Sequence, residues 1–133
     1  MTDEQAVATA TDNFYVALNI LFTGNSQPMK DAWSHDADVT YMGPDGLYLS
    51  GWEKIAQMWD SVSAIRLGGR VNPQQLQTVI GNDMALITCV ENGENEIDGK
   101  AEAVSIRSST VFHKRNGVWK VIAHQTDLLK YLN

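Results

Sequence analysis

Three histidines are the first candidates for acid–base chemistry in this chain of 133 residues. His35 follows a predicted short helix, where the helix dipole favours a cation, and that position alone accounts for it. His113 lies near a predicted hairpin tip, where we expect solvent. His124 is therefore the histidine to test as an acid or base. The histidines lack the spacing of a metal site and Cys89 has no CxxC partner, so the sequence predicts no metal and no other cofactor.

Arg107 places a charge in the middle of a predicted strand, and a buried arginine without a partner is costly. One interpretation is a structural pair with Asp127 or with an acid of a second copy of the chain. The other is that Arg107 lines a pocket and holds a ligand, in which case an anionic or carbonyl-bearing ligand is expected. The structural pair is the simpler of the two.

These residues must be positioned by one long β-hairpin, predicted from Gly99 to Leu129 around an Asn-Gly turn at 116–117. Neither face of this hairpin is polar throughout. We therefore expect helices on one side and a partner chain or a curled sheet on the other. A two-residue loop predicts a register that pairs Phe112 with Val121, Thr110 with Ala123 and Ser108 with Gln125.

Upstream of the hairpin, the hydrophobic period changes at Val71 from helical to alternating. An acidic stretch at 92–98 is expected to form a mobile loop. The other expected segments are helices at 2–22 and 27–33, a strand at 38–42, an extended piece at 47–49, a helix that follows a Ser50–Glu53 capping box and ends at Gly68-Gly69, and strands at 71–80 and 84–91.

The element order α-α-β-β-α-β-β-β-β predicts an α+β fold. We expect one domain over residues 1–133, in which the early helices pack on the concave face of a curved, mainly antiparallel sheet. A long helix cannot fill the whole concavity of such a sheet, so a pocket is expected toward the open end.

The composition limits the partners and the location. A net charge of −6 argues against nucleic acid and against an anionic membrane surface, because both require clustered basic residues. No apolar run is long enough to span a bilayer. The single cysteine fits a reducing compartment, and the acidic start MTDEQAV does not have the pattern of a signal peptide. We therefore expect a cytoplasmic protein.

Three stretches carry a family resemblance that covers nearly the whole chain: YVALNILFTGNSQPMKDAWSHDADVTYMGPDG, SGWEKIAQMW and VFHKRNGVWKVIAHQTD. Together they resemble the nuclear-transport-factor-2-like (NTF2-like) superfamily, in particular its small bacterial SnoaL-like members. More distantly, the chain is similar to the association domain of calmodulin-dependent kinase II. The resemblance implies a cone-shaped, cystatin-like fold with an internal pocket, and a homodimer formed through the outer face of the sheet.

The resemblance also suggests site residues. Ketosteroid isomerases of this superfamily place a tyrosine donor in the first helix, which maps to Phe14 with Tyr15 beside it. Their aspartate base maps to Tyr41, three residues after Asp38, and a phenol is a poor base at neutral pH unless its pKa is strongly shifted. SnoaL-like cyclases carry an acid–base carboxylate near the end of the chain, for which Asp127 is the nearest candidate. His124 and Asp127 would need a bulge to enter one pocket together.

Three hypotheses follow. The leading one is a protein that binds a small, partly apolar ligand in the cone. A second is a cofactor-free isomerase, cyclase or hydratase, and a third is a dimeric or larger protein-interaction module. The residues assigned to the ligand are Tyr15, Trp59, Arg107, Thr110 and Gln125, and those assigned to catalysis are Asp127, Asp38, His124 and Tyr41.

Overall fold

Helices come early and long strands come late in the computed structural model, which describes residues 1–133. This order confirms the predicted α+β class. The elements are α1 (Asp3–Leu21), α2 (Gln27–Ala32), β1 (Thr40–Met42), β2 (Tyr48–Ser50), α3 (Trp52–Ile65), β3 (Arg70–Ile80), β4 (Met84–Ile97), β5 (Lys100–Arg115) and β6 (Val118–Thr126).

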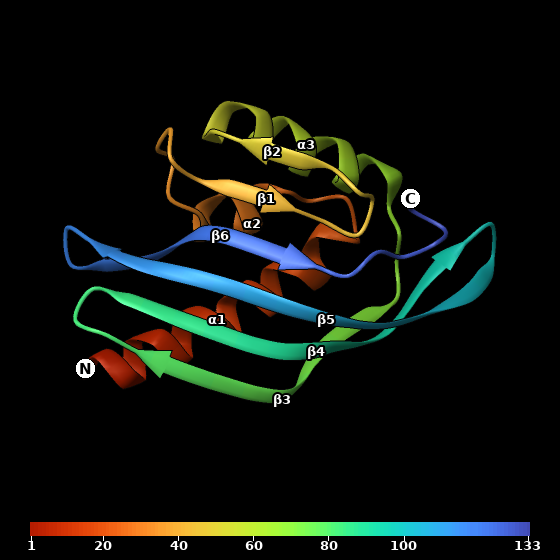
Figure 1. Ribbon diagram of the computed structural model, residues 1–133. Coiled ribbons are helices and arrows are strands. Elements are labelled where there is room, and N and C mark those ends of the chain that lie inside the picture. Colours follow the sequence, from red (N-terminus) through yellow and green to blue (C-terminus); the bar gives the residue numbers. More distant parts are fainter.

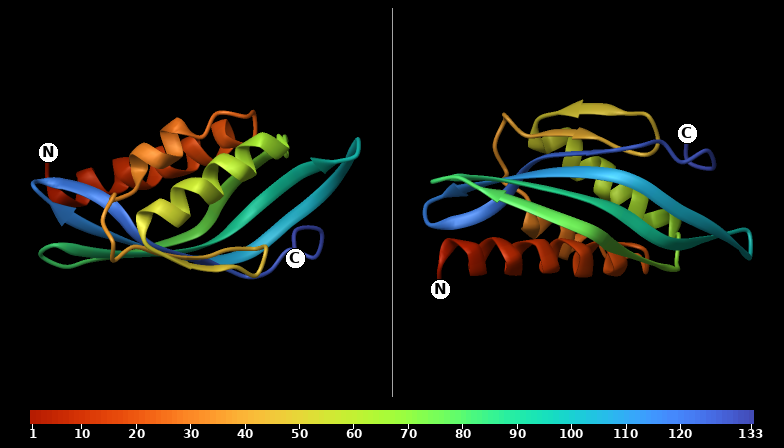
Figure 2. Two further views of the ribbon diagram at one scale, coloured as in Figure 1. Left: turned by 90° about the horizontal axis from the view of Figure 1, so that it is seen from above. Right: turned by 60° about the horizontal axis from the view of Figure 1, so that its bottom comes forward.

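All six strands belong to one sheet, in the order β2-β1-β6-β5-β4-β3. Neighbouring strands are antiparallel except β1 and β6, which are parallel. The three helices lie on one face of this sheet, and the sheet curves around them (Figures 1 and 2). The predicted curved, mainly antiparallel sheet with helices on its concave face is therefore confirmed. The outer face of the sheet is left without a covering layer.

The long first helix, α1, forms because its capping and its apolar stripe agree. Thr2 accepts a hydrogen bond from the Gln5 amide, and the Gln5 side chain accepts one from the Thr2 amide, which makes a capping box. Val7, Phe14 and Leu21 recur on one face, and all three are buried.

The start of α3 differs from the prediction. Gly51 is the N-cap residue, with φ of 95°, and no side chain caps the helix, so the predicted Ser50–Glu53 capping box is wrong. Ser50 is part of β2 and pairs with Thr40 of β1. The chain turns from strand to helix at Gly51 because glycine tolerates positive φ.

The acidic stretch at 92–98 is also not a mobile loop. Strand β4 continues to Ile97 and pairs with β5 along its whole length. Asn95 is almost completely buried, donates to the Gly68 carbonyl and accepts from the Tyr131 hydroxyl. The charges of this stretch concealed an alternation in which every second residue faces inward.

The predicted hairpin exists, but a bulge changes its register. Phe112 pairs with Val121 as predicted, whereas Thr110 pairs with His124 and not with Ala123. Ser108 likewise pairs with Thr126 in place of Gln125.

Ile122 has no partner in β5, because the register shifts between Val111 and Phe112. One extra residue in β6 reverses the side-chain alternation beyond it. Val121 and His124 are consequently both buried, while Gln125 is exposed on the other face. The bulge is therefore what directs His124 into the interior.

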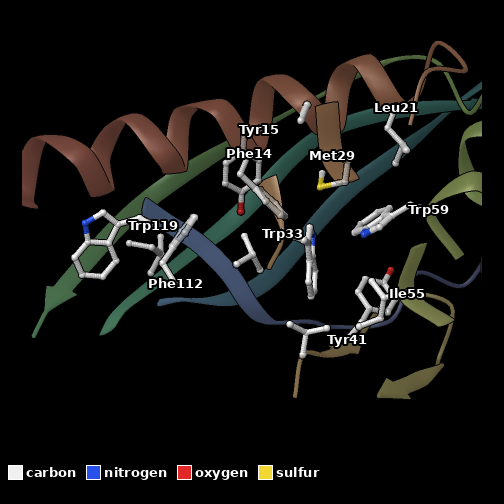
Figure 3. Close-up of a cluster of buried hydrophobic side chains, with 14 of the residues drawn as sticks. Phe14, Tyr15, Leu21, Met29, Trp33, Tyr41, Ile55, Trp59, Phe112 and Trp119 are labelled. Atoms are coloured by element: carbon white, nitrogen blue, oxygen red, sulfur yellow. The ribbon is translucent and has the colours of Figure 1, made fainter. Parts of the chain in front are cut away.

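Aromatic side chains fill the space between the helices and the sheet (Figure 3). The ring centroid of Trp59 lies 6.2 Å from that of Trp33 and 5.3 Å from that of Tyr41. Phe14 approaches His124 at 5.0 Å. Figure 3 shows Trp119 and Phe112 toward the amino terminus of α1, whereas Trp59 and Tyr41 lie toward the Leu21 end of this helix.

Candidate functional site

A cavity of about 200 Å³ lies at the end of the cone, between α1, α3 and the inner face of the sheet. Its walls are mainly apolar: 13 of 19 lining residues are hydrophobic. Helix α1 contributes Leu18 and Leu21, and helix α3 contributes Trp59, Val62 and Ile65. The polar residues in the lining are Tyr41, Asp45, Glu91, Asn95, His124 and Thr126.

Glu91, His124 and Tyr41 form the part of the cavity lining that we call its head. The exposed fraction of Glu91 is 4%. Its Oε2 atom accepts a hydrogen bond of 2.8 Å from the Tyr15 hydroxyl, which also lies 3.1 Å from Cys89 Sγ. Burial raises the pKa of Glu91 above its ordinary value, although the Tyr15 hydrogen bond acts in the opposite direction. A carboxyl group held neutral in an apolar pocket is a suitable general acid.

His124 lies opposite Glu91, with 3.8 Å between its Nε2 atom and Glu91 Oε2. The other ring nitrogen, Nδ1, is 2.8 Å from the Thr110 hydroxyl. Burial lowers the pKa of His124 to about 4, so the imidazole is neutral at neutral pH. Nε2 has no hydrogen-bond partner in the protein, so it can serve a ligand.

Tyr41 provides the third polar group at the head of the cavity. Burial raises the pKa of its phenol, and the nearby charges of Asp45 and Glu91 raise it further. The Tyr41 hydroxyl makes no hydrogen bond within the protein, and its ring lies against Gly43, where a Cβ atom would collide with it. Tyr41 therefore remains protonated and can donate to a ligand but cannot act as a base.

The far wall of the cavity is made by the segment after β6. Leu129 and Leu132 belong to the lining, and the Leu129 amide donates to the Pro44 carbonyl at 3.0 Å. The Tyr131 hydroxyl donates to Asn95 Oδ1, also at 3.0 Å. These two hydrogen bonds hold the carboxyl-terminal segment against the cavity.

The predicted pair of Arg107 and Asp127 is present, but it is outside the cavity. The Arg107 guanidinium binds both carboxylate oxygens of Asp127, at 2.8 and 2.9 Å. The Arg107 side chain is 83% exposed, so it does not hold a ligand in the cone. Hydrogen bonds from the side chain and the backbone of Arg107 lower the pKa of Asp127 to about 2. Asp127 is thus an ionised surface group, placed apart from His124.

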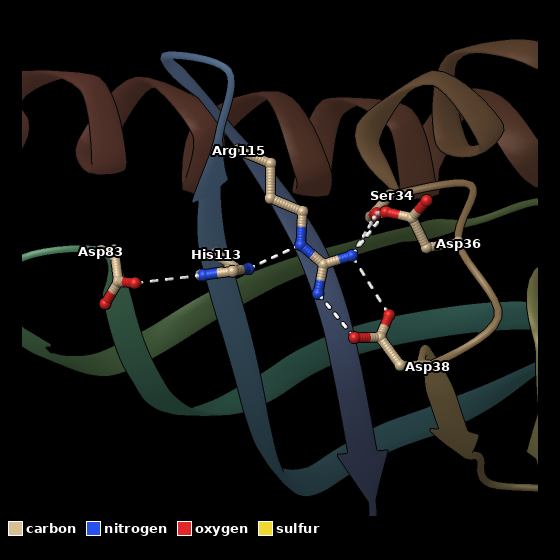
Figure 4. A network of polar contacts seen from close by, with 6 residues as sticks. All are labelled: Ser34, Asp36, Asp38, Asp83, His113 and Arg115. Carbon is tan, nitrogen blue, oxygen red and sulfur yellow. Dashed lines mark hydrogen bonds and ion pairs between the residues drawn. The ribbon is translucent and has the colours of Figure 1, made fainter.

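Asp38 is also remote from the cavity. It binds the Arg115 guanidinium, which contacts Asp36 and Ser34 as well, and this network ties the β5–β6 hairpin to the segment before β1 (Figure 4). The hydrogen bond from Arg115 lowers the pKa of Asp38. Asp38 is therefore part of a structural ion-pair network on the surface.

The remaining predicted residues divide between the site and its surroundings. Trp59, Tyr41 and His124 line the cavity, while Tyr15 supports Glu91 and Thr110 supports His124 from behind. Gln125 is exposed on the outer face of the sheet. No group of three His, Cys, Asp or Glu side chains is arranged to hold a metal ion.

Glu91 was not among the predicted site residues. A signal was available, because Ala85, Ile87, Cys89 and Glu91 alternate on one face of β4, and all four are buried. An acid that continues an apolar face is a strong indication of a buried carboxyl group. Glu91 was predicted as the last residue of the strand at 84–91 and was grouped with the acids of the expected loop at 92–98, so it was not assigned to the site.

The chain is a small α+β cone with a buried glutamate and a buried histidine at the head of an apolar cavity. A family model for the SnoaL-like domain matches residues 7–126, so the chain belongs to that family and to the NTF2-like superfamily. No curated protein matches the chain significantly. No helix has the length and apolar character needed to cross a membrane.

Solved structures support the fold. A protein of Streptomyces avermitilis, provisionally named a dehydratase of the NTF2-like family, is 21% identical with a TM-score of 0.83, and the match covers 96% of this chain and 97% of that one. A protein of Thiobacillus denitrificans, provisionally named a calcium/calmodulin-dependent kinase II association domain, is 20% identical with a TM-score of 0.77, over 92% and 94% of the chains. A protein of Shewanella frigidimarina, provisionally named a ketosteroid isomerase, is 21% identical with a TM-score of 0.75, and the match covers 92% of this chain and 94% of that one.

Proposed function

We propose that this protein binds a small, mainly apolar, neutral molecule in its cavity and catalyses proton transfer on it without a cofactor. The observation that carries this proposal is the buried Glu91 carboxyl group, which faces an apolar cavity with His124 Nε2 3.8 Å from its Oε2 atom. A perturbed carboxyl group in a cleft is typical of an acid–base site.

The lining limits the charge of the ligand. It contains two carboxyl groups, Asp45 and Glu91, and no lysine or arginine. An anionic ligand would have to leave water without gaining a cationic partner, which is unfavourable. The apolar walls formed by Leu18, Trp59 and Val62 favour a hydrocarbon or aromatic body.

The two carboxyl groups differ in environment, which suggests different roles. Glu91 is buried and has a raised pKa, so it is the acid that protonates an oxygen of the substrate. Asp45 is only partly buried and lies in the β1–β2 connection, where its carboxylate accepts a hydrogen bond from the Leu47 amide. It is the base that removes a proton from the carbon next to a carbonyl group. Transfer of one proton to oxygen and one from carbon yields an enol, as an isomerase or dehydratase requires.

Hydrogen–deuterium exchange at carbon tests this chemistry. We expect the protein in D2O to accelerate exchange of the α-hydrogens of 1-indanone and 2-tetralone, followed by proton NMR. Glu91→Gln and Asp45→Asn should each reduce the enzymatic rate by about 100-fold, within the usual range for an acid or base. Asp127→Asn and Asp38→Asn remove carboxylates outside the cavity and should leave the rate unchanged. Exchange no faster than in buffer for both ketones, or full activity of Glu91→Gln, would contradict the proposal.

We also propose a homodimer formed through the outer face of the sheet. Val79, Leu86 and Val111 are neighbours across β3, β4 and β5 on that face, and no helix covers them. Val79 is 65% exposed and Leu86 is 41% exposed. An uncovered apolar row of this kind is a candidate for contact with a second copy.

Light scattering after gel filtration tests the dimer. Leu86→Lys should give a monomer, because it places a charge in the middle of the apolar row. Val16→Lys is the control, because Val16 is 58% exposed on α1 at the helical side of the molecule. A wild-type monomer at micromolar concentration would rule out the proposed dimer.

A further inference from the structure

The Thr110 hydroxyl and the His124 imidazole form an isolated pair behind the cavity. Thr110 Oγ1 lies 2.8 Å from His124 Nδ1, and this is the only hydrogen bond that either side chain makes within the protein. Thr110 is 3% exposed and His124 is 5% exposed. Bulk solvent therefore barely reaches the hydroxyl.

The hydroxyl hydrogen of Thr110 decides the direction of this bond. If Nδ1 carried a proton, Thr110 would accept it, and the hydroxyl hydrogen would be buried without an acceptor. Leaving a buried donor unpaired costs about 1–3 kcal/mol. If Thr110 donates, its hydrogen has an acceptor, and Nδ1 is satisfied as well.

We infer that Thr110 is a positioning residue, which donates its hydroxyl hydrogen to Nδ1 of His124 and so fixes the imidazole as the Nε2–H tautomer. His124 then presents a hydrogen-bond donor to the cavity. The β6 bulge makes this possible, because it brings His124 directly opposite Thr110 in the ladder and turns both side chains inward.

The charge state of His124 agrees with this assignment. Burial lowers its pKa to about 4, so one nitrogen carries a hydrogen and the other does not at neutral pH. The groups around the ring are Thr110, Phe14, Tyr41 and Glu91. Of these only Glu91 could stabilise an imidazolium as an anion, and burial favours its neutral form.

The tautomer identifies the ligand group that fits the head of the cavity, a consequence that rests on the proposed function. Nε2–H of His124 and the hydroxyl of Tyr41 are donors without protein partners. Glu91 Oε2 accepts a hydrogen bond from the Tyr15 hydroxyl, so in the neutral form that burial favours, the carboxyl proton is placed on Oε1. Three donors in the lining of one apolar cavity suit a strong acceptor without a charge, such as the carbonyl oxygen of a ketone or an aldehyde.

Nitrogen-15 NMR of the ligand-free protein tests the tautomer directly. At pH 7 we expect His124 Nδ1 to resonate as an unprotonated nitrogen that accepts a hydrogen bond, and Nε2 as a protonated one. Thr110→Ser should preserve both resonances. Thr110→Val has nearly the same shape, and it should move the Nδ1 resonance downfield, because the hydrogen bond is lost. A protonated Nδ1 in the wild-type protein would overturn the inference, and so would an unchanged Nδ1 resonance in Thr110→Val.

Binding of matched probes tests the ligand class separately. We expect 1-indanone to bind more tightly than indane or indane-1-carboxylate, with quenching of tryptophan fluorescence as the readout, because Trp59 lines the cavity. Thr110→Val should weaken the binding of 1-indanone several-fold and leave the binding of indane unchanged. Thr110→Ser should bind 1-indanone as tightly as the wild type does. Equal affinity for indane and 1-indanone would reject the ketone as ligand class. Because the NMR measurement requires neither ligand nor turnover, a failure of the proposed catalysis leaves the tautomer result standing.

Discussion

Oε2 of Glu91 and Nε2 of His124 lie 3.8 Å apart, and the two side chains come from β4 and β6, on either side of β5. In water at pH 6 these groups would be oppositely charged. In the cone, burial raises the pKa of the acid and lowers that of the imidazole. Burial therefore favours the neutral form of both groups at the head of the cavity, and in that form each can donate a hydrogen bond.

His124 should make the stability of the protein depend on pH in the acid range. Its pKa is about 4 in the folded protein and about 6.5 when exposed, so the unfolded state binds the proton more readily between these values. The contribution of His124 is complete above pH 6.5 and is lost as the pH falls toward 4. The loss amounts to roughly 3 kcal/mol, measured as the free energy of unfolding in urea.

The control for this prediction is His124→Asn, which cannot titrate. The free energy of unfolding of the wild type should decrease relative to that of the variant as the pH decreases from 6.5 to 4. Taking the difference removes most of the contribution of Glu91, which has the opposite sign. A constant difference across this range would mean that the histidine is not held neutral by the fold.

Glu91→Gln should stabilise the protein at alkaline pH. The folded pKa of Glu91 is raised, so its contribution to stability is complete below its unfolded pKa and is lost as the pH rises through the folded one. Glutamine removes this penalty and can still accept from the Tyr15 hydroxyl. The variant should be more stable than the wild type at pH 8 and equal to it near pH 4.5.

Glu91→Leu separates the hydrogen bond from the charge. It also removes the penalty, but it leaves the buried Tyr15 hydroxyl without its carboxylate acceptor. Urea unfolding should therefore rank the glutamine variant above the leucine variant at both pH values. If Glu91→Gln is less stable than the wild type at pH 8, the fold does not favour the neutral form of Glu91.

The sequence predicted the layers of this fold because its strongest signals are local. The apolar stripe around Phe14 and the Asn-Gly turn at 116–117 each specify one element, and both are present. Glycine and asparagine occupy the positive-φ positions of the hairpin turn, as the turn type requires. The order of these elements was sufficient to predict helices on a curved sheet.

The site was harder to predict because it depends on one unpaired residue. The extra residue Ile122 reverses the alternation of β6, and nothing in the local sequence marks it. Without that bulge, Gln125 would face inward and His124 would face outward. Glu91 was missed for a different reason: the alternation of Ala85, Ile87 and Cys89 does direct it inward, but Glu91 stands next to the acidic stretch at 92–98, which was expected to be a solvated loop.

Asp127→Asn should alter acid stability without affecting the cavity. The folded pKa of Asp127 is about 2, below its ordinary value, so its contribution is present above pH 3.8 and is lost as the pH falls toward 2. The variant should unfold slightly more readily at pH 7, and this difference should disappear near pH 2. Because the pair with Arg107 is exposed, 0.5 M salt should also reduce the difference. Binding of 1-indanone should be unchanged. A loss of binding would show that Asp127 contributes to the ligand site.

Gly43 and Tyr41 should be energetically coupled, because Gly43 leaves the space that the Tyr41 ring occupies. A Cβ atom at position 43 would collide with the phenol ring, so Gly43→Ala must displace Tyr41 from the cavity wall. Overpacking of this kind costs about 1–3 kcal/mol. In the Tyr41→Ala background the space is free, so the same change should cost much less, and the two effects should be far from additive in a double-mutant cycle. Tyr41→Phe keeps the ring and should leave the full cost of Gly43→Ala in place. Urea unfolding of the four combinations measures the coupling, and additive losses in the Tyr41→Ala background would show that the ring does not lie over Gly43.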